Sequence, residues 1–130
     1  MLCTGDEIRP YVEANIAATL PESATFIADY RDGHIVSAAG FANWYGHDVE
    51  VFLASAGALG RKFLKRLGQY AFDELGCARV TCRVASDNPW CEVLTRVGFT
   101  LEGRMRRGFD GATIDMMIFG VLKEEYRYGR

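Results

Sequence analysis

A strand, a loop of small residues, a long amphipathic helix and a second strand follow one another in the middle of the chain. Residues 47–54 (HDVEVFLA) predict a strand, in which Val49, Val51 and Leu53 alternate with Asp48, Glu50 and Phe52. In residues 60–76 (GRKFLKRLGQYAFDELG) the apolar side chains recur at helical spacing, and residues 78–84 (ARVTCRV) predict a strand. Strands connected through a helix usually lie parallel and close together. This unit therefore predicts a parallel strand pair inside an α/β domain.

The segments on either side predict further strands and two shorter helices. These elements are a helix over 6–20, strands over 25–30 and 34–45, a helix over 89–97, and strands over 99–107 and 113–122 around a turn at 108–112. Asp32-Gly33 is typical of a tight hairpin turn, and Pro89 of a helix start. Residues 124–127 predict a solvated tail. We expect one α/β (α+β) domain over 1–130, with a mixed, mostly antiparallel sheet, a central splayed parallel strand pair and flanking helices.

The composition is that of an ordinary globular domain, with 130 residues, 49% of them hydrophobic, and a net charge of -2. A slightly acidic chain is poorly suited to coat nucleic acid, because that affinity comes mostly from Lys and Arg at phosphates. No apolar run approaches the roughly 20 residues that span a bilayer, and the N-terminus does not resemble a signal peptide. We expect a cytoplasmic protein without membrane contact.

Cysteines and histidines are too few and too scattered to predict a metal site. The four cysteines, Cys3, Cys77, Cys82 and Cys91, form no C-x-x-C pair, and there are two histidines. We expect reduced thiols and no metal.

The loop between the central strand and helix, Ser55-Ala-Gly-Ala-Leu-Gly60, consists almost entirely of small residues. A helix start presents unpaired N–H groups and a partial positive charge, so such a loop is suited to bind an anion. Its spacing matches neither a P-loop nor a dinucleotide-binding fingerprint. The cations that follow, Arg61, Lys62, Lys65 and Arg66, indicate either a polyanionic ligand or a solvated basic face.

The segment after this helix carries a more specific pattern, made by Asn88, Leu94, Gly98, Phe99, Glu102, Gly103 and Arg106. With these residues in register, the run from Ala58 to Arg106 resembles the cofactor-binding half of the GNAT acyltransferases. It is most similar to the branch that acetylates the N-termini of ribosomal proteins, and it covers over a third of the chain. The resemblance implies a fold in which two parallel strands splay apart around the pantetheine arm of acetyl-CoA, with the pyrophosphate on the loop before the helix.

The resemblance also implies which residues contact acetyl-CoA as co-substrate. They are Leu53, Ala54, Ser55, Gly57, Ala58, Leu59, Gly60, Arg61 and Asn88. Asn88 is also expected to cap the following helix. The family loop reads Q/R-x-x-G-x-G/A, so Ser55 replaces its basic residue and Ala58 its middle glycine. A methyl group at Ala58 would crowd a phosphate if that position required a positive φ.

Acyl transfer from a thioester to an amine requires removal of a proton from the amine and return of one to the thiolate. Glu50 lies where the family often places a carboxylate base, although a solvent-facing strand residue is the alternative. Cys91 stands where the family has a serine that protonates the thiolate. We expect the helix N-terminus to lower the pKa of this thiol. The alternative for Cys91 is a small buried filler.

Three aromatic residues near turns, Trp44, Tyr45 and Trp90, are expected beside the cleft and to shape the acceptor site. About two dozen residues precede the strand at 25–30, where the family has a strand and two helices that form one wall of that site. The groove is therefore expected either to be open to a protein or peptide amine or to be completed by another subunit. Residues 113–122 are apolar enough for a homodimer contact.

The leading hypothesis is an N-acetyltransferase that transfers acetyl from acetyl-CoA to an amine. One alternative is a catalytically degenerate GNAT fold with a structural or interaction role, for example one encoded by a phage, since compact chains of this kind occur there. The other is nucleic-acid binding through five arginines, Arg79, Arg83, Arg104, Arg106 and Arg107.

Overall fold

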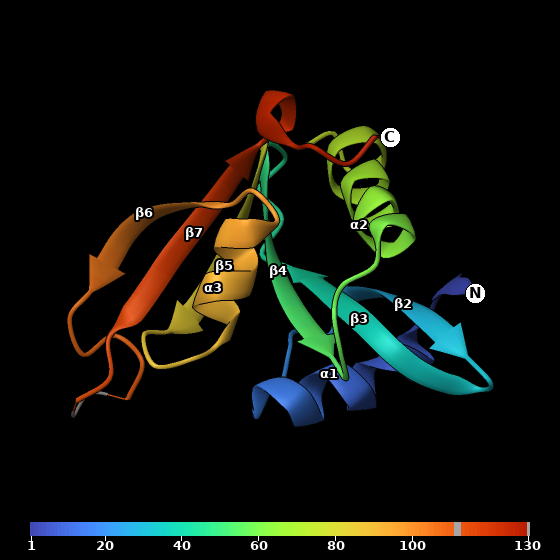
Figure 1. The fold of residues 1–130 in the computed structure, drawn as a ribbon, viewed down its shortest axis with the longest axis horizontal. Helices are drawn as coiled ribbons and strands as arrows, with labels where there is room; N and C mark the ends of the chain where they lie inside the picture. The colour runs from blue at the N-terminus through green and yellow to red at the C-terminus, as the bar shows by residue number, and fades with distance from the viewer. Residues whose placement is uncertain (111–112, 130) are drawn as a thin grey trace.

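The computed structural model describes residues 1–110 and 113–129, and its strands form one mixed sheet of seven strands (Figure 1). The strands are β1 (Leu2–Thr4), β2 (Thr25–Arg31), β3 (His34–Ala42), β4 (Asp48–Ser55), β5 (Arg79–Ala85), β6 (Thr100–Met105) and β7 (Met116–Leu122). Their spatial order is β1-β2-β3-β4-β5-β7-β6. Each neighbouring pair is antiparallel except β4 and β5, which are parallel. The predicted fold class is confirmed.

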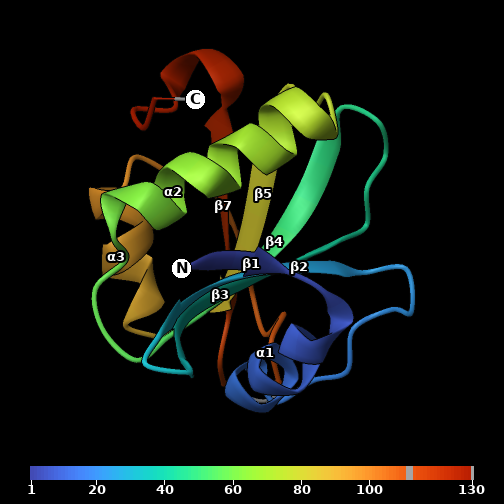
Figure 2. The same cartoon turned by 90° about the vertical axis from the view of Figure 1, so that its right-hand side faces the viewer.

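Helices cover both faces of this sheet. They are η1 (Asp6–Ile8), α1 (Arg9–Ile16), α2 (Arg61–Gly68), η2 (Gln69–Glu74), α3 (Trp90–Arg96) and η3 (Lys123–Glu125). The helix predicted over 60–76 is α2 continued by η2, a π-helix. Phe63 and Leu94 bring α2 and α3 into one core, and Val12 brings α1 into a second core on the other face. Figure 2 shows α2 above and α1 below the N-terminal strands.

The N-terminal segment differs from its prediction in two ways. The helix expected over 6–20 is the short η1 followed by α1, and it stops at Ala17, which has a left-handed φ of 54°. Strand β1, which was not predicted, pairs with β2 at the edge of the sheet. A strand of three residues is too short to show an alternating pattern, so the sequence carries no signal for it.

The hairpin between β2 and β3 is confirmed, with Asp32 and Gly33 at φ angles of 52° and 79°. Both central residues have a positive φ, as a type I′ turn requires. The predicted strand over 34–45 ends earlier, at Ala42. In the predicted turn at 108–112, Gly111 and Ala112 lie outside the described residues.

The predicted solvated tail is wrong at Tyr126. This side chain is buried, its hydroxyl donates a hydrogen bond to the Leu64 carbonyl oxygen at 2.5 Å, and its ring centroid lies 5.4 Å from that of Phe72. The end of the chain therefore packs against α2 and η2. Neighbouring Glu124 and Glu125 are exposed, which is why the segment has a polar composition.

Strands β4 and β5 are paired at one end only. Ladder pairs join Asp48 to Arg79, Val49 to Val80 and Glu50 to Thr81, and within the described chain none follows. Beyond that point β4 pairs with β3 as far as Ser55, and β5 pairs with β7 as far as Ala85. The facing edges of the two strands therefore diverge into a gap, as Figure 1 shows.

Polar side chains connect the strands at the paired end. The Thr81 hydroxyl donates to Asp48 Oδ1 at 2.9 Å and lies 3.2 Å from Arg79 Nε, which donates to it. Arg79 Nη2 in turn donates to Glu102 Oε1 at 2.6 Å. Because Glu102 lies on β6 and Arg79 on β5, this ion pair crosses β7 over Gly120, where an added Cβ would overlap both charged groups.

Replacing Gly120 with alanine is expected to lower the free energy of unfolding by about 1 kcal/mol, because the methyl group displaces the flexible, partly exposed ends of the Arg79–Glu102 pair. The matched control is Gly103→Ala in β6, where a Cβ meets only Ile118 Cδ1 at 3.8 Å. It should cost no more than about 0.5 kcal/mol. Urea denaturation of both variants measures the difference, and equal midpoints would contradict this account of Gly120.

Candidate active site

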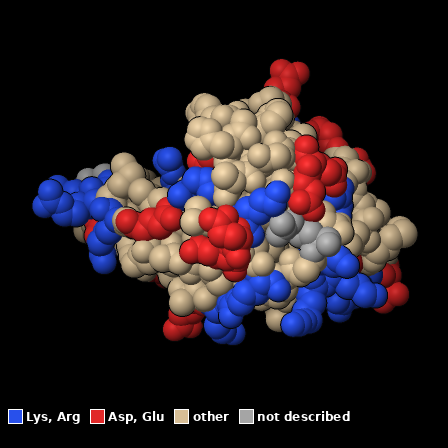
Figure 3. All heavy atoms as spheres, turned by 90° about the horizontal axis from the view of Figure 1, so that it is seen from above, with Lys and Arg blue, Asp and Glu red and all other residues tan. Residues whose placement is uncertain are grey.

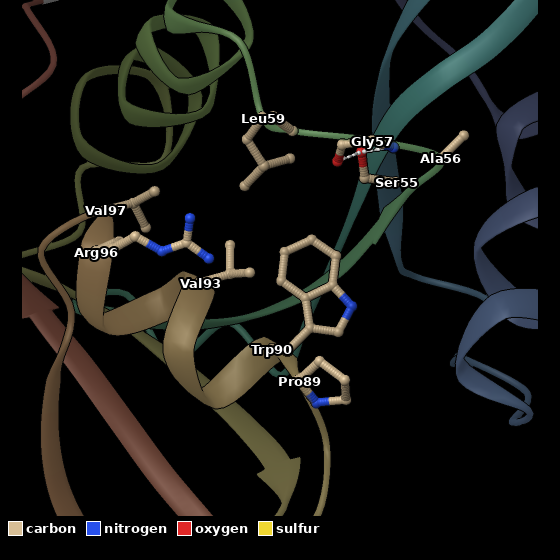
Figure 4. Close-up of a pocket in the computed structure, with 10 residues that line it drawn as sticks. Ser55, Ala56, Gly57, Leu59, Pro89, Trp90, Val93, Arg96 and Val97 are labelled. Carbon is tan, nitrogen blue, oxygen red and sulfur yellow. Dashed lines mark hydrogen bonds between the residues drawn. The ribbon is translucent and has the colours of Figure 1, made fainter.

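Two cavities lie on opposite faces of the sheet at the gap between β4 and β5, and Trp90 lines both. The loop cavity, of about 520 Å³, lies between the β4–α2 loop and α3 (Figure 4). It is lined by Ser55, Ala56, Gly57, Ala58, Leu59, Pro89, Trp90, Val93, Arg96 and Val97. The sheet cavity, of about 510 Å³, is lined by Asn15, Ile16, Ala18, residues 50–53, residues 82–85, Asn88, Trp90, Phe109 and Met116. The gap thus has open space on both sides.

Ser55 shapes the start of the loop. Its hydroxyl oxygen accepts a hydrogen bond from the Gly57 N–H at 3.1 Å and lies 3.0 Å from Ser37 Oγ on β3. The next N–H, of Ala56, donates to the Val36 carbonyl at 3.0 Å. The first two N–H groups after Ser55 are therefore bound within the protein, which leaves the later loop and the first turn of α2 for a ligand.

Ala58 does not strain the loop. All the loop residues are described, and none of them has a positive φ, so a methyl group is tolerated at this position. Gly57 and Gly60 have open space where a side chain would lie. The crowding that a positive φ at Ala58 would cause is therefore absent.

The cations near the loop point in different directions. Arg61, Lys62 and Lys65 are exposed, whereas Arg66 turns away to form an ion pair with Glu74 and lies 5.8 Å from the Tyr70 ring centroid. The cation that faces the loop cavity from the other side is Arg96 on α3 (Figure 4).

Arg96 was not among the predicted site residues. A signal for it existed in the sequence, because Trp90, Val93 and Arg96 follow one another at intervals of three residues on one helix. Residues at that spacing share a helix face. Figure 4 shows the Arg96 guanidinium and the Trp90 indole facing the Leu59 side chain across the cavity.

Glu50 lies at the point where the two strands diverge. Its carboxylate is mostly buried, with 13% of the side chain exposed, and it lines the sheet cavity. Oε1 accepts a hydrogen bond from Asn43 Nδ2 at 2.9 Å, and Oε2 lies 3.9 Å from Arg83 Nε. Asn43, which sequence reasoning missed, holds a left-handed φ of 55° just after β3. Glu50 thus has the predicted position, while its role as a base stays a prediction.

Burial affects two cysteines: Cys82, which lines the sheet cavity, and Cys91, which lines a separate cavity between α3 and β7 and neither of the two beside the gap. It raises the pKa of Cys82 to about 12, and it also raises the pKa of Cys91, whose Sγ lies 3.5 Å from the Ala85 carbonyl oxygen. The expectation that the helix N-terminus lowers the Cys91 pKa is therefore wrong. Burial is the largest cause, and it outweighs the lowering of the pKa by the Cys91 backbone N–H at the start of α3.

Asn88 performs the capping role that the sequence predicts. Its Oδ1 accepts a hydrogen bond from the Trp90 N–H at 2.9 Å, at the start of α3. The side chain also lines the sheet cavity. Its contact with a ligand stays a prediction.

Of the three aromatic residues expected at the cleft, only Trp90 lies there. Trp44 and Tyr45 line another cavity, together with Phe41 and Leu75. They are 55% and 72% exposed. The chain turns back after β3 toward the start of β4, which carries these two residues away from the end where β4 and β5 diverge.

Of the five arginines expected on a nucleic-acid surface, two are closely paired with carboxylates and a third lies farther from one. Arg79 contacts Glu102 at 2.6 Å, Arg104 contacts Asp115 at 2.6 Å, and Arg83 lies 3.9 Å from Glu50. Figure 3 shows Lys and Arg at the left end of the molecule, with both signs of charge interspersed over the rest of this face. These pairs reduce the charge available to phosphates.

Within residues 1–110 and 113–129, no three His, Cys, Asp or Glu side chains are grouped as metal ligands. The helices of the same residues include none that is long and apolar enough to cross a membrane.

The fold matches solved acetyltransferase structures. A mutant form of the spermidine/spermine N-acetyltransferase SpeG from Vibrio cholerae aligns with a TM-score of 0.74 at 14% identity, over 97% of this chain and 96% of that one. The protein yncA from Salmonella typhimurium, solved with its cofactor acetyl-CoA, gives 0.73 at 16% identity, over 100% and 97%. A GNAT-family acetyltransferase from Bacillus anthracis gives 0.65 at 16% identity, over 89% and 73%.

At these identities the likeness establishes the fold, which is that of the GNAT acetyltransferases. A scan against protein-family profiles and a search of curated protein sequences each give no match.

Alkylation of Cys91 by iodoacetamide is expected to have a pH midpoint above about 8.5, the ordinary value for a thiol, because burial disfavours the thiolate. Mass spectrometry of the modified peptides over a pH series measures this midpoint, and the partly exposed Cys3 reports reagent activity in the same sample. A Cys91 midpoint below pH 8 would show instead that the helix N-terminus dominates.

Proposed function

We propose that the chain is an N-acyltransferase that binds acetyl-CoA in the gap between β4 and β5 and transfers its acetyl group to an amine in the sheet cavity. The observation that carries the proposal is the end of the β4–β5 ladder at Glu50 and Thr81, with a cavity on each side of the gap beyond it. The fold comparison supports it, since yncA was solved with acetyl-CoA.

The residues around the gap fit such a ligand. Beyond Glu50, the β4 edge that includes Leu53 and Ala54 faces β5 without a ladder partner, so its backbone is open to the amides of a pantetheine arm. In this proposal the later loop, the first turn of α2 and Arg96, which lines the loop cavity, hold the phosphates, with the exposed Arg61 at the start of α2.

The chemistry assigned to the chain is proton transfer. When bound, acetyl-CoA supplies an acetyl thioester whose C–S bond breaks as the amine nitrogen bonds to the acetyl carbon. Glu50 takes the proton from the amine, directly or through water. Cys91 is the proposed donor of a proton to the departing sulfur; its thiol is protonated at neutral pH and lies beside the Ala85 carbonyl oxygen at the end of β5, outside the lining of both cavities.

The acceptor was predicted to be a protein or peptide amine in an open or shared groove. In the structure, Asn15, Ile16 and Ala18 at the end of α1 line one side of the sheet cavity. This wall supports an acceptor small enough to fit between α1 and β5. The peptide acceptor, the homodimer, the ribosomal-protein branch, the phage source and the cytoplasmic location stay predictions.

A catalytically degenerate fold with an interaction role is the second candidate. It is favoured by Ser55, which replaces the basic residue of the family loop and whose hydroxyl occupies the Gly57 N–H. A loop with fewer available donors holds a pyrophosphate less tightly.

Acetyl-CoA at about 100 times its dissociation constant is expected to stabilise the protein by about 2.7 kcal/mol and to raise its melting temperature. Arg96→Ala should reduce the shift, because this guanidinium faces the loop cavity. The control Arg31→Ala removes an exposed arginine on the β2–β3 hairpin and should leave the shift unchanged. No shift at millimolar acetyl-CoA would reject acetyl-CoA binding and favour the degenerate fold.

Glu50→Gln is expected to slow single-turnover acetyl transfer by about 10²-fold or more, because the amide cannot accept the amine proton. Cys91→Ala should slow it less, by about 10-fold, and Cys91→Ser should retain most of the rate because a hydroxyl remains as donor. Rapid-quench assays with an amine panel measure these rates. Unchanged rates in Glu50→Gln and Cys91→Ala would remove both assignments and leave the fold assignment intact.

A further inference from the structure

The sheet cavity contains a second charged side chain besides the Glu50 carboxylate. Arg83 lies on β5, two residues beyond Thr81, and lines the same cavity. Its side chain is 49% exposed, and its Nε lies 3.9 Å from Glu50 Oε2. A carboxylate and a guanidinium therefore lie side by side at the point where transfer is proposed to occur.

Arg83 is less tightly paired than other arginines of this sheet. Arg79 Nη2 lies 2.6 Å from Glu102, and Arg104 Nε lies 2.6 Å from Asp115. The 3.9 Å separation between Arg83 and Glu50 is too long for a hydrogen bond, and no hydrogen bond to Arg83's guanidinium is found among the described residues. Arg83 lines the cavity with about half of its side chain exposed, so its donors are available to a ligand there, and a guanidinium is well suited to bind a carboxylate or phosphate.

The remaining walls of the cavity are mainly apolar. Ile16, Phe52, Phe109 and Met116 contribute to them, from α1, β4, the β6–β7 turn and β7. An acceptor that fits this lining has an apolar part next to its charged groups. Arg83 also disfavours a second positive charge on the acceptor, because like charges repel in a confined site.

We infer that the acceptor is a small amine with an anionic group beside the amino group, as in an α-amino acid with an apolar side chain. Glu50 receives the ammonium group and Arg83 binds the anion. The inference rests on the proposed function, because it assumes that Glu50 marks the place of the reacting amine. It separates this chain from an enzyme for polyamines, the substrates named for SpeG.

The test compares leucine, leucinamide and spermidine as probes. Isothermal titration into protein saturated with CoA measures binding without turnover, and release of the CoA thiol from acetyl-CoA measures kcat and KM. For the wild type, leucine should bind at least about 10-fold more tightly than leucinamide, the equivalent of one charged contact. Spermidine should bind more weakly still.

Arg83→Ala should raise both the dissociation constant and KM for leucine by about 10-fold or more and leave those for leucinamide within about 2-fold. Arg83→Lys should recover part of the loss, since it keeps the charge without the fork of donors. Arg31→Ala is the matched control, because Arg31 also has a loose ion pair, at 3.7 Å from Asp29, but is not among the residues that line the sheet cavity. It should behave as the wild type.

Equal or tighter binding of leucinamide or spermidine by the wild type would overturn the inference, and preference for leucinamide would favour a peptide terminus. A fall in kcat of equal size for each amine in Arg83→Ala, with KM unchanged, would also overturn it, because Arg83 would then act by positioning Glu50. If either result is found in a protein whose melting temperature rises with acetyl-CoA, only the acceptor inference fails and the proposed function stands. If acetyl-CoA neither raises the melting temperature nor releases its thiol with any of the amines, the proposed function and the acceptor inference both fail.

Discussion

The limited pairing of β4 with β5 is the constraint on which the rest of the molecule depends. Three ladder pairs join these strands, supported by the hydrogen bond from Thr81 to Asp48 and by the Arg79–Glu102 pair. Beyond them each strand follows a different neighbour, β3 or β7. A sheet that was paired throughout would have no opening, whereas this one leaves unpaired strand edges beside two cavities.

The charges of the sheet divide according to whether they hold strands together or face a cavity. Arg79 is closely paired with Glu102 across β7, and Arg104 is closely paired with Asp115, just before β7. Arg96 and Arg83 face the two cavities, one on each side of the gap. Under the two proposals, Arg96 binds the phosphates of the co-substrate and Arg83 binds the acceptor. Trp90 lines both cavities.

Burial has a larger effect on the pKa of the Cys91 thiol than the start of α3 does. The sequence places Cys91 in the first turn of a helix, where a dipole lowers a thiol pKa. The fold places the same thiol against the core, beside the Ala85 carbonyl oxygen, and its pKa is raised. A thiol of ordinary pKa is already protonated at neutral pH, so the raised pKa leaves the proton in place and makes Cys91 a weaker acid.

The sequence by itself determined the strand–loop–helix–strand unit, the Asp32-Gly33 hairpin and the Asn88 cap, because each depends on periodicity or on neighbours a few residues away. Only the tertiary structure decided what depends on segments far apart in the chain. Arg83 and Arg96 face cavities because β4 and β5 diverge, and Trp44 is carried away from them by the turn after β3. Tyr126 is buried because α2 offers it a partner 62 residues earlier, which no local pattern records.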